Sequence, residues 1–177
     1  MTNYRHSLGK ILAAHVDSAY DPKRREFIER IASALYERHA QFQQWPESVR
    51  LFYACYDINF QVGNGGFAQA AYNVPELLPV AEKAFENFGR EQAADLCRRA
   101  VSMLPAELRE HLAKGLRDRP LIDDVFAHFS ESEMAQLDEN LPGEFWADDA
   151  LQDLVQRHRK DFESVDQITY LAGQRPG

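Results

Sequence analysis

The sequence lacks three features that would assign it to a common functional class: long apolar runs, clustered histidines and multiple cysteines. No apolar stretch approaches the roughly 20 residues that a membrane-spanning helix needs. Residues 1–6 are followed by mixed polar sequence, not by the apolar segment of a secretory signal. We therefore expect a cytoplasmic protein with no membrane partner.

Cysteine and histidine are too few and too scattered for a disulfide framework or a zinc motif. Cys55 and Cys97 both fall in apolar segments with helical spacing, and we expect two buried free thiols. None of the six histidines lies three or four residues from another, so no two share a helix face. The chain has no Gly-x-Ser-x-Gly elbow, and no Lys-Ser or Lys-Thr follows the glycines of residues 63–66 as in a P-loop. We expect no catalytic residue, no metal site and no cofactor, and predict that the protein is not an enzyme.

Apolar residues, by contrast, are abundant and recur at helical spacing. They make up 45% of the 177 residues and include 11 Phe and 7 Tyr, enough for a globular core. Alternating strand patterns are almost absent, although a short ribbon is left open. We predict an all-α fold, a single domain over residues 1–177 that forms a helical bundle of about seven to nine helices.

Start and stop signals place several of these helices. Asp148 is expected to cap a last long helix, because aspartate is a favoured N-cap residue. Three glycines among residues 63–66 are expected to break the helix that begins at Pro46. The predicted helices cover residues 22–36, 46–60, 75–88 and 91–104, a segment after the capping-box pattern of residues 130–133, and residues 148–162.

The net charge of −8 is concentrated in one third of the chain. Residues 106–155 hold 13 Asp and Glu against 4 Lys and Arg, and residues 120–156 hold no Lys or Arg. Apolar residues are interleaved with these acids, so residues 118–153 are predicted to form an acidic helical region with carboxylates on a rigid outer surface. The predicted partner-binding residues are Asp118, Asp123, Asp124, Glu131, Glu133, Asp138, Glu139, Glu144, Asp148, Asp149 and Asp153.

Such a surface has two interpretations. It is either a solubilising face without a partner or a docking surface for a basic protein. A DNA-binding protein is the natural candidate, because its Lys and Arg side chains are arranged to contact a rigid array of phosphates. We therefore predict an acidic protein-binding module that does not itself bind nucleic acid.

A short motif in the middle of the chain carries a family resemblance. The motif consists of Asn64, Gly65, Gly66, Phe67, Gln69 and Asn73. Together with the alanine-containing helices that follow it and the acidic helices further on, it resembles the bacterial DNA mimic protein 19-like family. The resemblance covers residues 25–165 loosely, and residues 57–100 carry most of it. The chain departs from the family pattern at Gln61 and Gly63, where Glu and often Asn are expected.

The resemblance implies an all-α fold and, for the member that gave the family its name, imitation of DNA that occupies a transcription regulator. It also implies a structural role for the motif, in which Asn64 and Asn73 bond exposed backbone and Phe67 anchors the corner. Some members lie among toxin–immunity clusters, which leaves open an immunity protein that neutralises a toxin such as a nuclease. An enzyme with an unrecognised site would need polar groups that converge near Asn64, Gln69 and Asn73.

Three aromatic residues leave the oligomeric state open. Trp45, Tyr72 and Trp146 would seal a homodimer if they were exposed, but they fit equally well in the core of a monomer.

Overall fold

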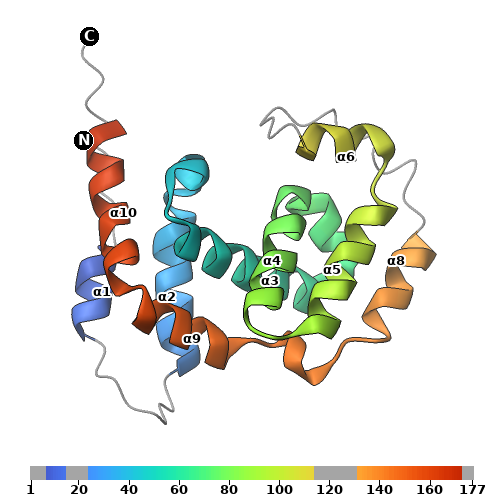
Figure 1. The fold of residues 1–177 in the computed structure, drawn as a ribbon, viewed down its shortest axis with the longest axis horizontal. Helices are drawn as coiled ribbons and strands as arrows, with labels where there is room; N and C mark the ends of the chain where they lie inside the picture. Colours follow the sequence, from blue (N-terminus) through green and yellow to red (C-terminus); the bar gives the residue numbers. More distant parts are fainter. Residues whose placement is uncertain (1–6, 15–23, 114–130, 173–177) are drawn as a thin grey trace. The chain divides into compact units, whose positions relative to one another are not determined.

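The computed structural model describes residues 7–14, 24–113 and 131–172, and within these ranges the chain forms helices and no strand. The described part contains nine α-helices and three short 3-10 helices (Figure 1), which confirms the predicted all-α fold. The α-helices are α1 (Leu8–Ala14), α2 (Arg24–Tyr36), α3 (Glu47–Asn73), α4 (Leu78–Asn87), α5 (Glu91–Met103), α6 (Ala106–Ala113), α8 (Glu131–Asp138), α9 (Asp148–Arg157) and α10 (Arg159–Ala172). The 3-10 helices are η1 (His39–Gln44), η2 (Pro75–Leu77) and η3 (Gly143–Phe145).

These helices belong to two compact units, and α3 contributes to both. The terminal unit comprises residues 1–53 and 147–177, and the central unit comprises residues 54–146. The single domain over residues 1–177 stays a prediction. Among the described residues, no helix is both long enough and apolar enough to cross a membrane.

In the terminal unit, α1 packs on α10 and α2 packs on α9 (Figure 1). The N-terminus of α1 is closed by Asp166 of α10, whose carboxylate accepts hydrogen bonds from the Ser7 hydroxyl (2.8 Å) and the Gly9 amide (3.2 Å). The same carboxylate lies 3.0 Å from the guanidinium of the buried Arg38. Because the first amides of a helix have no acceptor within it, a carboxylate from another helix can satisfy them and complement the helix dipole.

The core of the central unit is built around three aromatic rings. Phe67 of α3, Phe85 of α4 and Phe145 of η3 are all fully buried. The Phe145 ring stacks on Phe85, with centroids 5.2 Å apart, and meets Phe67 edge to face at 5.7 Å. Helices α4 and α5 pack side by side, and the turn that joins them includes Gly89 at a φ of 69° (Figure 1). The cluster of Phe67, Phe85 and Phe145 thus packs the second half of α3 against α4 and η3.

Two glycines interrupt α3, as the sequence predicted. Gly65 (φ −166°, ψ 25°) and Gly66 (φ 75°, ψ −175°) both leave helical geometry. The positive φ favours glycine at position 66, where an added Cβ would also lie 2.1 Å from Oδ2 of Asp138. The other carboxylate oxygen of Asp138 accepts a hydrogen bond from the Phe67 amide at 2.9 Å. Asp138 therefore caps the second half of α3 from the end of α8.

Two of the predicted helix boundaries were wrong. The N-cap of α9 is Ala147, while Asp148 is the first helical residue and its carboxylate lies 3.4 Å from the guanidinium of Arg25. The predicted last long helix is two helices, because the backbone leaves helical geometry at His158 (φ −115°, ψ 27°). Neither glycine nor proline marks this break, so the sequence carried no signal for it.

Asp138 provides a test of how the interruption of α3 at Gly65 and Gly66, which we call the α3 corner, is held in place. Burial raises the pKa of Asp138 above its usual value, while the hydrogen bond from the Phe67 amide opposes this shift. Asp138→Asn keeps an acceptor for that amide and removes the half-buried charge, so we expect it to be at least as stable as wild type at neutral pH. Asp138→Ala should lose about 1 kcal/mol of unfolding free energy. Urea unfolding of both variants measures the difference.

The pH dependence of these stabilities follows from the direction of the shift. Because the pKa of Asp138 is raised in the folded state, its ionised form costs stability at neutral pH. This cost shrinks as the pH falls through the raised pKa and is gone below the pKa of the unfolded chain. The advantage of Asp138→Asn over wild type should therefore shrink on acidification. The exposed neighbour Glu139 provides the control, since Glu139→Gln should change little. An equal, pH-independent loss in Asp138→Asn and Asp138→Ala would contradict this role.

Candidate functional site

The structure divides the predicted acidic region, residues 118–153, between the two units. Helix α8 and η3 belong to the central unit, whereas α9 belongs to the terminal unit. In the central unit the exposed predicted residues are Glu133, Glu139 and Glu144, and Asp138 is half-buried at the corner. In the terminal unit Asp149 and Asp153 are exposed, and Asp148 is half-buried beside Arg25. The remaining predicted residues fall outside the description: Asp118, Asp123, Asp124 and the side chain of Glu131.

The two units differ in net charge. The terminal unit contains 12 Asp and Glu and 12 Lys and Arg, so its formal charge is zero. The central unit contains 16 Asp and Glu against 8 Lys and Arg, so it carries the whole net charge of −8. The excess negative charge of the chain therefore arises from residues 54–146.

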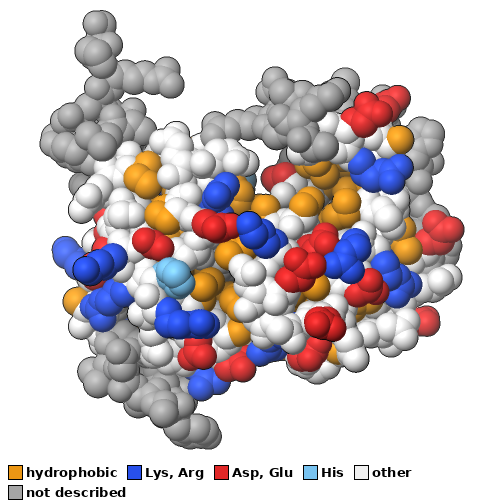
Figure 2. All heavy atoms as spheres, in the orientation of Figure 1, with side chains coloured by type: hydrophobic (Ala, Val, Ile, Leu, Met, Phe, Trp, Pro, Cys, Tyr) orange, Lys and Arg blue, Asp and Glu red, His pale blue; other side chains and the backbone are white. Residues whose placement is uncertain are grey.

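The central unit is not uniformly acidic, because α4 and α5 carry an exposed ion-pair cluster. The guanidinium of Arg98 contacts the carboxylates of Glu82 (2.8 Å), Glu86 (2.8 Å) and Asp95 (3.2 Å). These carboxylates, Glu82 first, raise the pKa of Arg98. Figure 2 shows acidic and basic side chains intermixed over these two helices. Residues 78–103 hold four Asp and Glu and four Lys and Arg, so the excess of carboxylates lies in other parts of the unit.

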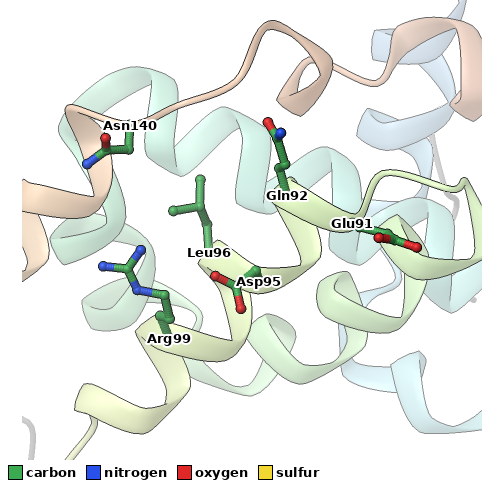
Figure 3. Close-up of a pocket in the computed structure, with 6 residues that line it drawn as sticks. All are labelled: Glu91, Gln92, Asp95, Leu96, Arg99 and Asn140. Carbon is green, nitrogen blue, oxygen red and sulfur yellow. The ribbon is translucent and has the colours of Figure 1, made fainter.

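A shallow hollow of about 490 Å³ lies between α5 and the residues that follow α8. In Figure 3, Arg99 and Asn140 lie on one side of it, Gln92 lies on the other, and Leu96 points between them. Glu91 and Asp95 complete the lining. The lining combines two carboxylates, a guanidinium and two amides, and it contains no histidine, hydroxyl or thiol.

The family motif is tied together by a network of side-chain amides across the α3 corner. Oε1 of Gln61 accepts hydrogen bonds from Gln69 Nε2 (3.0 Å) and Asn73 Nδ2 (2.8 Å). Nε2 of Gln61 donates to Oδ1 of the buried Asp57 at 3.1 Å. The Asn64 side-chain amide donates to the Phe60 carbonyl at 2.9 Å, one turn earlier, so Asn64 bonds the backbone as predicted. The same prediction was wrong for Asn73, which bonds the side chain of Gln61.

Gln61 is therefore the centre of this cluster, although the sequence marked it only as a departure from the family pattern. Its amide donates to one neighbour and accepts from two others, which a carboxylate at the same position cannot do. A glutamate there would also place a second negative charge beside Asp57. The requirement for glutamine depends on a residue one turn earlier in α3, so only the folded helix reveals it.

The described residues include two buried thiols and no cluster of metal-binding side chains. Cys55 and Cys97 are free and buried, as predicted, and burial raises the pKa of the Cys97 thiol. Across residues 7–14, 24–113 and 131–172, no three His, Cys, Asp or Glu side chains converge to hold a metal ion.

The amide network predicts a pH-dependent effect of Gln61→Glu. At neutral pH the carboxylate cannot donate to Asp57 and repels it, so the free energy of unfolding should fall by about 1–2 kcal/mol. The repulsion raises the pKa of the introduced carboxyl, and its protonation restores the lost donor. The deficit should therefore shrink as the pH is lowered, which urea unfolding at several pH values would show.

The matched control for this experiment is Gln61→Met, which keeps the length of the side chain but removes all three hydrogen bonds. Its deficit should change less with pH than that of Gln61→Glu, because it introduces no ionisable group and only removes the donor to Asp57. Parallel pH profiles for the two variants would show that the network does not depend on a neutral donor at this position.

Comparison with known proteins places the chain in a family. The sequence profile of the DMP19-like protein family matches residues 43–161, about two thirds of the chain. No curated protein and no solved structure shows significant similarity to it. The matched range includes the interrupted helix α3, the Gln61 network, and the helices from α4 to α9. The resemblance seen in the motif is confirmed, and the chain belongs to the DMP19-like protein family.

Proposed function

We propose that the chain is an acidic protein-binding module, whose central unit docks on a basic protein at the surface which that protein uses to bind DNA. One observation carries the proposal: the whole net charge of −8 belongs to residues 54–146, while the rest of the chain is neutral. A charge this unevenly distributed steers association with a positively charged surface and makes binding sensitive to salt.

Buried side chains hold the exposed carboxylates of the central unit in place. Glu133 lies in α8 and Glu139 directly follows it, on either side of the fully buried Met134 and Leu137. Glu144 precedes the fully buried Phe145. Because the backbone that carries these carboxylates is already packed, binding has to order only their side chains, which suits a surface that substitutes for DNA phosphates.

Family membership supports the choice of partner. The family takes its name from a DNA mimic protein, and a transcription regulator is the kind of basic protein that such a surface fits. The proposed function is binding, and it requires no metal, no cofactor and no reaction.

Two sets of three substitutions test which unit binds. The central set neutralises Glu133, Glu139 and Glu144 as Gln, and the terminal set neutralises Asp148, Asp149 and Asp153 as Asn. Both sets change the net charge by the same amount. The proteins that wild type retains from host lysate are identified by mass spectrometry and purified, and their affinities are measured by calorimetry over a range of salt concentrations. We expect the central set to weaken binding roughly tenfold at low salt and the terminal set to have a smaller effect.

The identity of the purified partner decides between the candidate functions. A DNA-binding protein that is displaced from its DNA by the wild-type chain supports the proposal. A toxin whose activity the chain blocks would identify an immunity protein instead. Equal effects of the two sets, or affinity that does not depend on salt, would contradict docking through the acidic central unit.

A further inference from the structure

The central unit exposes two large apolar side chains that flank one turn of α3. Phe60 is 51% exposed and Trp146 is 44% exposed. The Trp146 ring lies against Gly63, where an added Cβ would be 3.2 Å from Cη2 of the indole. Gly63 follows Phe60 by three residues, so both rings border the same turn of the helix. We call Phe60 and Trp146 the aromatic pair.

The aromatic pair is presented on a rigid support. Trp146 meets Phe145 edge to face, with centroids 5.6 Å apart, and Phe145 is itself fully buried in the core of the unit. The turn that carries Phe60 is reinforced by the hydrogen bond from the Asn64 side chain to the Phe60 carbonyl. The Trp146 ring, which already lies against Phe145 and Gly63, loses little entropy when a partner covers it, and tryptophan is enriched among the residues that dominate binding energy.

The charge of the unit indicates what covers the pair. A second copy of this chain, docked through the same face, would bring two units of charge −8 together, and such like-charge contact is costly. A basic protein meets no such repulsion, and its arginine side chains can stack on an indole face through cation–π interaction. Glu144, two residues before Trp146, adds a negative charge that attracts a basic protein.

We infer that the aromatic pair is the apolar anchor for a basic protein segment whose Lys and Arg side chains are interspersed with apolar ones. This inference rests on the proposed function, since it assigns a site on the same partner-binding unit. An anchor of this kind changes the salt response: the electrostatic part of the affinity is screened as salt rises, whereas the contribution of buried apolar surface remains.

Two synthetic helical peptides of equal length and charge serve as probes. One has lysines on one face and leucines on the other, and the second has glutamine in place of every leucine. Calorimetry measures the affinity of each peptide for wild type, Trp146→Ala, Phe60→Ala and the control Tyr36→Ala, which removes a ring that is 71% exposed in the terminal unit. Circular dichroism establishes that each variant is folded.

Wild type should bind the leucine peptide about tenfold more tightly than the glutamine peptide, and retain this preference at high salt. Trp146→Ala and Phe60→Ala should each lose most of the preference but keep the weaker, salt-sensitive affinity for the glutamine peptide. Tyr36→Ala should behave as wild type. A preference that survives both substitutions overturns the anchor but leaves the proposed function intact. Failure of wild type to bind either peptide counts against both.

Light scattering addresses the competing occupant. We expect wild type and Trp146→Ala to have the same mass in solution. A wild-type dimer that Trp146→Ala or Phe60→Ala converts to monomer would assign the aromatic pair to a second copy of the chain and overturn the inference.

Discussion

The carboxylate of Asp138 holds the corner on which the central unit depends. It lies against the backbone of Gly66, where the absence of a Cβ leaves room for the carboxylate, and it accepts a hydrogen bond from the Phe67 amide. That contact fixes where the second half of α3 begins and directs Phe67 into the rings of Phe85 and Phe145. It also ties the end of α8 to α3, although the two segments are far apart in the sequence. Glu139, the next residue, is exposed at the same end of α8.

The terminal unit uses the same device at a different place. Asp166 of α10 accepts amides at the start of α1 and pairs with the buried Arg38. In both units a carboxylate from a distant helix satisfies donors that a helix terminus leaves free. Some carboxylates of an acidic protein are thus bonded within the fold, so a count of acids along the chain overstates the number that a partner can contact. Asp138 illustrates this, because it lies among the predicted partner-binding residues.

The sequence predicted most of the longer helices, the interruption of α3 and the buried thiols, because each depends on local spacing or on glycine. It did not predict α1, α6 or the part of α3 that follows the interruption. It did not predict the break at His158, where no helix-breaking residue is present. It left the place of Trp45 open, and the structure buries that ring (3% exposed) against Phe42 and Tyr53 while Trp146 stays exposed. These outcomes depend on which helices meet, and local sequence patterns do not reveal that.

The candidate site shows the same limit more strongly. Composition located an acidic region along the chain, but its division between a neutral and a charged unit appears only when distant segments are assigned to units. The role of Gln61 is another case. Its side chain looked like a departure from the family pattern, and only its contacts with Asp57 and Gln69 explain why an amide stands there. Surface function is thus less predictable than helix position, because it depends on tertiary neighbours.

Hydrogen–deuterium exchange of the complex with the purified basic partner tests most directly the claim that the central unit is the binding element. If the claim is right, exchange slows in α8, η3 and the α3 segment around Phe60, while α1, α2, α9 and α10 exchange as in the free chain. Protection confined to those four helices of the terminal unit would contradict it, whatever the affinity of the complex.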